Sequence, residues 1–390
     1  MMGAFSLLLE RGQAFPAGSF WPDSAATIPI SSEHFTASKD RGPDQQSVVL
    51  YGRRGMSQEA LLWVDSSGAL RSGVDIESWI ISLQQELYRP AHRPPLSSRL
   101  FIHYHFIPGW IRNVIARILL KRKDPPPSHP SFPDSINDVG CQLFMRLATH
   151  ASGRSFEKQC ILTHDIDTAR GLDWIDPIAA LEEKHGYRSL WNYIPYRYRI
   201  DENHFDRLRD RGHEIGVHGF WHDNSEAFLK PVRFREILDS LQPQIERFKI
   251  RSYRGPSWYR TPEMFDALMG YFDFDLTCPD VDLMCPGYPG GVGLMLPFEI
   301  RPGLTEIPCT LPFDLFLLTG SLPEALPSLW EEKLRAIEAL GGLLVVNTHP
   351  DPNYLGSKRL LKVYEHFLQN LASSRWKGML PSQLNLSKGS

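Results

Sequence analysis

The second half of the chain alternates short apolar runs with longer amphipathic stretches. Short apolar runs bounded by polar residues predict strands that are buried on both faces, and apolar residues spaced three and four apart predict helices. The predicted strands cover residues 160–163, 189–194, 214–218, 252–254, 272–277, 306–309 and 343–347. The predicted helices cover residues 204–211, 225–248, 262–270 and 328–340. Strands that alternate with helices indicate parallel βα units, so the pattern predicts an α/β protein whose sheet forms a barrel.

The first 150 residues show a different pattern. Residues 1–45 are rich in Ser, Pro, Gly and Ala without clear periodicity, which is typical of irregular structure. The pattern then predicts three elements, strands at 47–51 and 61–64 and a helix at 76–88. We therefore expect an N-terminal α+β extension of unknown role over residues 1–150 and a catalytic barrel over residues 151–390.

One more amphipathic stretch precedes the barrel. Residues 110–123 place apolar side chains on one face and basic side chains on or after the other, and Pro125 to Pro127 end the predicted helix. Such a stripe is most often packed against the rest of the protein. The alternative is a peripheral contact with an anionic membrane surface, which the basic residues would favour.

Composition and charge narrow the class of protein. The 390 residues include 42 basic and 45 acidic ones, for a net charge of -3, which gives no support to nucleic-acid binding. The five cysteines are too scattered for a disulfide framework or a CxxC pair, so a reducing compartment is expected: Cys141, Cys160, Cys278, Cys285 and Cys309. The apolar run at residues 4–9 is short and follows no basic residue, unlike a secretory signal. No run has the length of a membrane-spanning helix, and we expect a cytoplasmic protein.

Carboxylates and histidines gather just after the predicted strands. Asp165 and Asp167 follow the first strand and point to one side, because alternate residues of an extended segment share a face. His218 and His222 follow the third strand. Alone, either pair would often have a structural role, such as an aspartate that caps the next helix. Together they indicate a metal held by Asp167, His218 and His222, with positions left open for water and substrate and with Asp165 as a base.

Arg254 and the loop after it extend the candidate site. An arginine at a strand end can hold a carboxylate bidentately, which would keep Asp165 ionised. The loop that follows offers Ser257, Trp258 and Tyr259 as candidates for substrate binding, with backbone N–H groups that can face a developing oxyanion. An ordinary surface arginine is the alternative for Arg254 taken by itself.

His349 is the candidate general acid. It follows the strongly apolar run at 343–346, which places it at the mouth of the barrel. A histidine there can protonate a leaving amine if a carboxylate keeps it charged, and Asp275 is the expected partner. A solvated loop histidine is the alternative.

These segments resemble, in order, the motifs of the polysaccharide deacetylase family, also known as carbohydrate esterase family 4 (CE4) or the NodB-homology fold. The resemblance runs from Cys160 to Asp351 through the segments 163–167, 212–222 and 254–256, Asp275 and His349. It implies a distorted (β/α) barrel of the TIM type that binds a divalent metal, Zn²⁺ first, with Co²⁺, Ni²⁺ or Mn²⁺ as alternatives. It also implies hydrolysis of an N-acyl group, usually N-acetyl on an amino sugar. The resemblance implies that Asp165 is the base and that Arg254 orients it. It implies that Asp167, His218 and His222 are the metal ligands. It also implies that His349 is the acid and that Asp275 tunes this acid.

The chain departs from the family pattern at two motifs. Ile166 separates two aspartates that are usually adjacent, and Thr168 follows where glycine is usual. Ser257 follows Pro256 where a Pro-Tyr pair is usual, which affects the expected substrate more than the chemistry. The proline-rich run at 279–302 predicts a long loop over the mouth of the barrel.

Three functions fit the sequence. The first is an N-deacylase acting on an amino sugar or a sugar-containing intermediate, nucleotide-linked or lipid-linked, in polysaccharide or glycolipid metabolism. The second is an amide hydrolase of the same fold that acts on a non-carbohydrate small molecule, such as a secondary metabolite or a ureide. The third is a barrel that only binds a glycan, which the full set of candidate catalytic residues disfavours. The sequence does not indicate an oligomeric state.

Overall fold

The computed structural model describes the barrel over residues 156–280, 291–312, 314 and 326–384, and only short segments before it. The earlier segments are the strands at 26–30, 33–37, 47–54, 57–64 and 70–72, together with residues 84–86 and 94. The predicted helix at 110–123 lies outside the described residues, as does most of the one at 76–88 and part of the loop at 279–302. Among the described residues, no helix is long and apolar enough to cross a bilayer.

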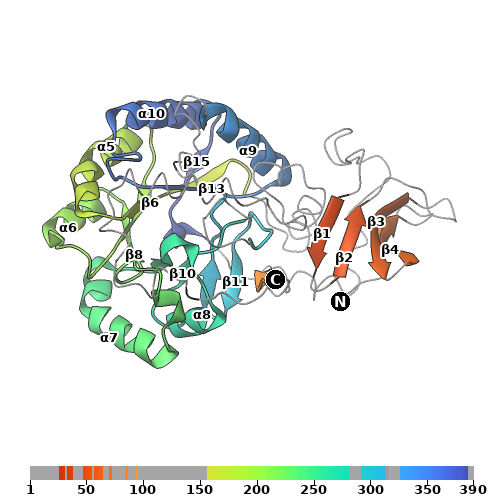
Figure 1. The fold of residues 1–390 in the computed structure, drawn as a ribbon. Helices are drawn as coiled ribbons and strands as arrows, with labels where there is room; N and C mark the ends of the chain where they lie inside the picture. Colours follow the sequence, from red (N-terminus) through yellow and green to blue (C-terminus); the bar gives the residue numbers. More distant parts are fainter. Residues whose placement is uncertain are drawn as a thin grey trace.

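The N-terminal strands form an antiparallel sheet of five strands in sequence order. They are β1 (Ala26–Ile30), β2 (Glu33–Ala37), β3 (Ser47–Arg54), β4 (Ser57–Val64) and β5 (Leu70–Ser72) (Figure 1). The strands predicted at 47–51 and 61–64 are confirmed as parts of β3 and β4. The prediction of irregular structure over residues 1–45 was wrong for β1 and β2. These short strands are formed by pairing with their neighbours, although their sequences show no clear alternation of polar and apolar residues.

The second sheet has ten strands, and its order is β11-β12-β10-β9-β8-β7-β6-β14-β13, with β15 beside β6. The strands that carry the site are β6 (Gln159–Ile166), β7 (Ser189–Tyr193), β8 (Glu214–His218), β9 (Ser252–Arg254), β10 (Phe274–Asp275) and β14 (Leu344–Thr348). The shorter ones are β11 (Phe298–Arg301), β12 (Leu304–Glu306), β13 (Leu311–Pro312) and β15 (Lys377–Gly378). All neighbours pair in parallel except β11, which runs antiparallel to β12.

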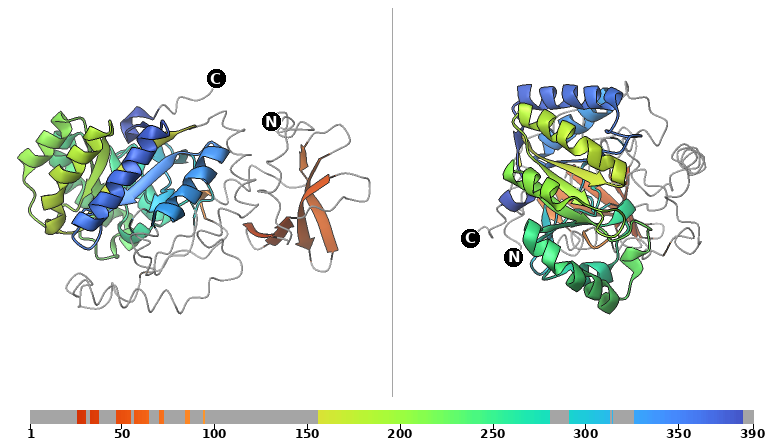
Figure 2. Two further views of the ribbon diagram at one scale, coloured as in Figure 1. Left: turned by 90° about the horizontal axis from the view of Figure 1, so that it is seen from above. Right: turned by 90° about the vertical axis from the view of Figure 1, so that its left-hand side faces the viewer.

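Within the described part of the chain, six α-helices cover the outside of this sheet (Figures 1 and 2). They are α5 (Ile175–Lys184), α6 (Glu202–Asp210), α7 (Pro231–Phe248), α8 (Pro262–Leu268), α9 (Leu326–Leu340) and α10 (Lys358–Ser373). Short 3₁₀ helices lie at η4 (Ala169–Trp174), η5 (Glu226–Phe228), η6 (Pro256–Trp258) and η9 (Pro381–Gln383). The sheet curls, and among the described strands its order ends at β11 and β13 without closing. This is the distorted (β/α) barrel that was predicted.

The predicted helix over 225–248 is two elements, and proline explains the break. Pro231 has no N–H to donate and a fixed φ, so it starts α7 cleanly at its first position. The residues before it form η5, which carries Glu226. Lys249 ends α7 in the left-handed region with φ 51°.

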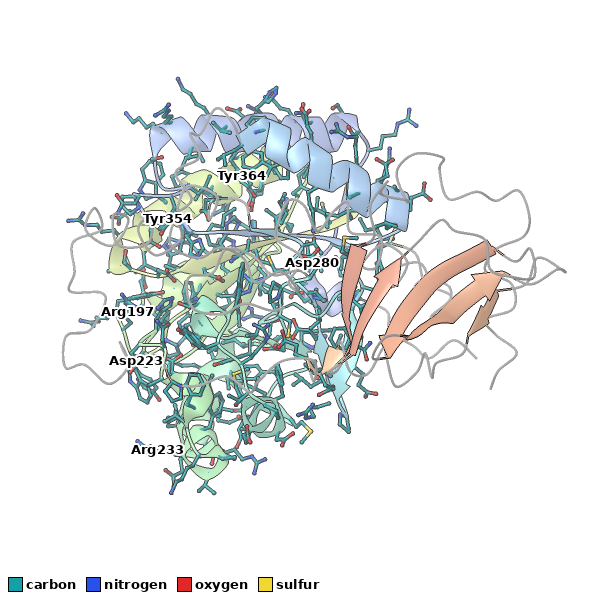
Figure 3. All side chains as sticks on the ribbon, turned by 45° about the vertical axis from the view of Figure 1, so that its right-hand side comes forward. Arg197, Asp223, Arg233, Asp280, Tyr354 and Tyr364 are labelled. Atoms are coloured by element: carbon teal, nitrogen blue, oxygen red, sulfur yellow. The ribbon has the colours of Figure 1, made fainter. Side chains whose placement is uncertain are left out.

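Polar contacts join the helices to the sheet beneath the site. Tyr364 of α10 points inward and donates to Glu182 of α5 over 2.6 Å (Figure 3). Glu182 also lies 2.8 Å from Nε2 of His164, the residue before Asp165 on β6. All three side chains are buried. The described cysteines Cys160, Cys278 and Cys309 are buried and free.

Candidate active site

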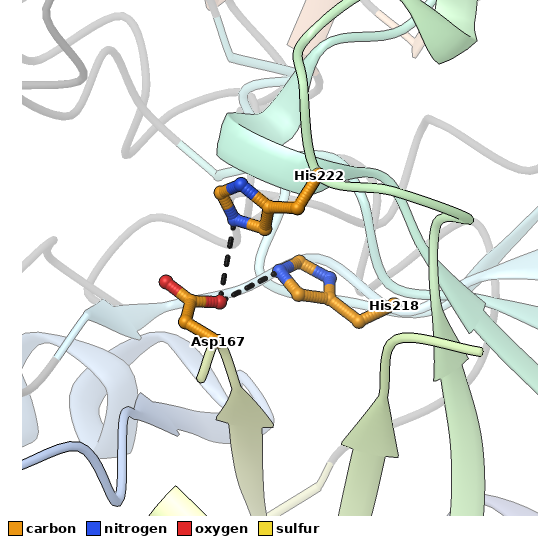
Figure 4. Close-up of side chains that lie close together, drawn as sticks. All are labelled: Asp167, His218 and His222. Carbon is orange, nitrogen blue, oxygen red and sulfur yellow. Dashed lines mark ion pairs between the residues drawn. The ribbon is translucent and has the colours of Figure 1, made fainter. Parts of the chain in front are cut away.

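The predicted metal ligands meet at the edge where the parallel strands end. Asp167 follows β6, His218 is the last residue of β8, and His222 lies in the loop after it. Oδ1 of Asp167 lies 3.3 Å from Nε2 of His222 and 3.5 Å from Nε2 of His218 (Figure 4). The three ligand atoms all lie within 4.8 Å of one another. The sequence prediction that these residues come together is therefore matched by the geometry.

The donor set fits a borderline divalent cation. Nδ1 of His218 lies 3.1 Å from the carbonyl oxygen of Arg254, so it is the nitrogen that carries the proton. Nε2, which faces Asp167, is left with its lone pair free to bind a metal. A backbone acceptor on the outer nitrogen is the arrangement that usually orients metal-binding histidines. Two imidazoles and one carboxylate suit Zn²⁺, and also Co²⁺, Ni²⁺ and Mn²⁺.

Asp165 lies beside the ligands and is held by other residues. Its Oδ1 accepts from Nδ2 of Asn192 over 2.8 Å and from Nη1 of Arg254 over 3.0 Å. Its Oδ2 lies 3.9 Å from Nε2 of His218. Burial raises the pKa of Asp165, but the charge of Arg254, with smaller contributions that include the Asn192 hydrogen bond, outweighs it and lowers this pKa to about 2. Asp165 is thus a carboxylate at neutral pH with one oxygen fixed and the other turned to the ligands.

Arg254 is fully buried and fixed by several acceptors. Its Nη1 donates to Thr163 over 2.8 Å and to Asn347 over 2.9 Å, and its Nε donates to the Leu276 carbonyl over 2.9 Å. The contact with Asp165 is made by Nη1 alone, so the expected bidentate arrangement was wrong. These contacts of Nη1 and Nε join β6, β14 and the residue after β10 around the carboxylate, while Nη2 has no hydrogen-bond partner among the described residues.

Asp314, rather than Asp275, is the partner of His349. Oδ1 of Asp314 lies 2.9 Å from Nδ1 of His349, and its Oδ2 accepts from the His349 backbone N–H over 2.6 Å. Asp275 instead accepts from N and Oγ1 of Thr277 and pairs in register with Glu306 of β12. The expectation for Asp275 was wrong because β10 is far from β14 in the sheet, whereas Asp314 follows β13, the direct neighbour of β14.

We expect Asp314→Asn to shift the alkaline limb of the pH–rate profile of hydrolysis toward neutral pH. Burial lowers the pKa of His349, but the charge and hydrogen bond of Asp314, helped by Asp167 and Asp165, outweigh it and raise this pKa to about 10. An acid that must be protonated loses function as pH rises through its pKa, so removing the negative charge brings that loss to lower pH, by about 1–3 units. The measurement is kcat/KM against pH for both proteins. An unchanged alkaline limb would show that Asp314 does not set the protonation of His349.

The loop after β9 differs from its predicted role. Trp258 and Tyr259 are only 3% and 5% exposed and pack into the core, where Tyr259 meets Phe228 at 5.8 Å between ring centroids. Their side chains therefore present little surface to a substrate. Ser257 is half-buried and left-handed, with φ 51°. Of the three candidates, Ser257 alone is not fully buried, and its contact with substrate stays a prediction.

Two further residues that sequence reasoning missed hold the aspartates of β6. Asn192 lies in register with Asp165 on the neighbouring strand, and a polar residue inside the apolar run 189–194 was the available signal. Asp351 accepts from the backbone N–H of Asp167 over 3.1 Å and from the Thr168 hydroxyl. The position of Asp351, two residues after His349, did not indicate this role, because residue types do not predict a contact with a backbone amide.

The comparisons with known proteins find similar structures and no similar sequence. No family model and no curated protein matches the chain. A structure from Mycobacterium smegmatis named as a polysaccharide deacetylase is 19% identical and has a TM-score of 0.44, with 57% of this chain and 87% of that one covered. A CE4 family pseudoenzyme from Bacillus anthracis is 17% identical, with a TM-score of 0.39 over 60% of this chain and 66% of its own. The chitin deacetylase of the fungal pathogen Colletotrichum lindemuthianum is 13% identical, with a TM-score of 0.39 over 59% and 92%.

Proposed function

We propose that this protein is a metal-dependent hydrolase that removes an N-acyl group, N-acetyl first, from an amino sugar or a sugar-containing intermediate of polysaccharide or glycolipid metabolism. One observation carries the proposal. A set of three metal-ligand atoms, a separately fixed carboxylate and a His–Asp pair all lie at the same edge of the sheet. A site that only bound a glycan would not need metal ligands, a fixed carboxylate and a His–Asp pair in one place.

Asp167, His218 and His222 would hold the metal. When bound, a divalent metal supplies a Lewis acid that polarises the acyl carbonyl and makes water more acidic. The chain contributes the geometry, because His218 is fixed through the Arg254 carbonyl and Asp167 through the Asp351 carboxylate.

Asp165 would accept the proton of the attacking water. Its Oδ1 is occupied by Asn192 and Arg254, so Oδ2 is the oxygen that can receive a proton. Its low pKa keeps it ionised across the whole neutral range. General base catalysis requires this protonation state together with hydrogen-bond reach of the nucleophile.

His349 would protonate the departing nitrogen. Its Nδ1 is engaged by Asp314, so Nε2 is the nitrogen that donates. The raised pKa of His349 keeps it charged at neutral pH, which is the form an acid needs. Proton transfer from His349 then gives a free amine and a carboxylate as products.

Acetate release from a panel of substrates tests the proposal. The panel contains N-acetylated monosaccharides, nucleotide-linked and lipid-linked N-acetyl sugars, and small non-carbohydrate amides. We expect turnover of at least one amino-sugar class by the metal-loaded protein, with the loss of activity in His349→Gln as the control for contaminating enzymes. Turnover confined to the non-carbohydrate amides would overturn the sugar assignment, and no turnover of any amide would overturn the hydrolase assignment.

A further inference from the structure

The loop that carries His222 has an unusual backbone. Gly219, His222 and Asn224 all have positive φ, at 60°, 58° and 66°. A positive φ is uncommon for residues other than glycine, although asparagine and histidine adopt it more readily than most. The loop also follows directly from β8, so the chain turns between the two histidine ligands. A contact with the backbone of His222 would stabilise this conformation.

Glu226 supplies that contact from inside the protein. It is 1% exposed and lies at the start of η5, four residues after His222. Its Oε1 accepts from the backbone N–H of His222 over 2.6 Å and from that of Trp221 over 2.5 Å. One of these hydrogen bonds ends on the backbone of a proposed metal ligand and the other on the residue before it, so a single buried oxygen holds the loop at His222.

Gly219 makes room for this carboxylate. A Cβ at position 219 would lie 2.1 Å from Oε2 of Glu226 and 2.4 Å from Cγ of Pro256. Both distances are far inside van der Waals contact, and φ at this residue is also left-handed. The glycine, the glutamate and the turn of the loop are therefore fitted to one another.

We propose that Glu226 is a positioning residue that sets His222 as a metal ligand by holding the backbone amides of Trp221 and His222. The inference rests on the proposed metal site. Without the carboxylate, two amides would lose their acceptor, and the positive φ of His222 would lose its support. His218 differs, because it ends a strand and is held by the ladder with β9.

Metal affinity of three Glu226 variants tests this role. Glu226→Leu removes the acceptor, Glu226→Asp withdraws it by one methylene, and Glu226→Gln keeps a carbonyl oxygen that can accept from both amides. Competition of the metal-free proteins with a chromogenic chelator for Zn²⁺ gives the affinity, and the visible spectrum of Co²⁺ gives the ligand geometry. We expect a loss of about 10–100-fold in affinity for the Leu and Asp variants, as is typical when a residue that supports a ligand is lost, and rescue to about wild-type affinity by Gln.

Leu368→Ala is the matched control for a loss of packing. Leu368 is fully buried on α10, so this variant should lower the thermal stability and leave the Zn²⁺ affinity unchanged. Wild-type affinity and Co²⁺ spectra in both the Leu and Asp variants would overturn the positioning role. A Gln variant as weak as the Leu variant would overturn it too. If the wild-type protein itself bound no metal, the proposed function would fail instead, so the two failures are distinguishable.

Discussion

Replacing His222 with alanine is expected to abolish stoichiometric metal binding and to lower amide hydrolysis about 10³-fold or more. The variant leaves one imidazole and one carboxylate, which are too few ligands for a stable catalytic site. The Lewis acidity that is lost with the metal contributes several kcal/mol, and each 1.36 kcal/mol corresponds to a factor of ten in rate, which sets the expected loss at about 10³-fold. Metal content after dialysis and kcat/KM for an N-acetyl substrate are the two measurements.

His213→Ala is the matched histidine control. His213 is buried next to β8, but its nitrogens face Ser189 and Glu183 rather than the ligands. This variant should keep one metal per chain even if its stability falls. A His222→Ala protein that binds metal with wild-type affinity would show that His222 is not a ligand.

Replacing Asp165 with asparagine is expected to lower kcat/KM by about 10²–10⁴-fold, the usual contribution of a general base, while metal binding is kept. Asparagine can still accept from Asn192 and Arg254 through its amide oxygen, so the local structure should persist. It cannot take a proton from water. Metal content and kinetics measured on the same preparation separate this effect from that of His222→Ala.

Asp173→Asn is the control for the charge change. Asp173 is exposed in η4, a few residues beyond the ligand Asp167, and has no place in the proposed mechanism. We expect wild-type turnover for this variant. Wild-type turnover in Asp165→Asn as well would remove Asp165 from the mechanism.

Much of the site could be predicted because strand ends of a parallel sheet meet at one edge. The strands predicted at 214–218 and 252–254 coincide with β8 and β9, so the sequence placed His218 and Arg254 correctly at strand ends. Asp167 was placed by its spacing to β6, and His222 by its spacing to β8. Contacts that depend on strand order could not be predicted, because the sequence pattern shows where strands lie but not which strands are neighbours.

Asp314 and Glu226 show what the pattern could not reveal. Asp314 follows β13, which has only two paired residues, one of them a proline, and therefore gave no strand pattern. Glu226 acts on backbone amides, and such a contact depends on the conformation of the loop rather than on residue types. Trp258 and Tyr259 were predicted to bind substrate because they lie in the loop after a strand end, but both belong to the core. Sequence pattern does not show whether an aromatic side chain in a loop points to the site or to the core.

Metal depletion followed by stepwise reloading tests most directly whether this site is a metal-dependent N-deacylase. The chelator-treated protein should release no acetate from its N-acetyl substrate, and activity should return in proportion to added Zn²⁺ until one metal is bound per chain. The same titration of His222→Ala should restore nothing. Full acetate release by the metal-free protein, or activity that is independent of the metal bound by Asp167, His218 and His222, would contradict the proposed function.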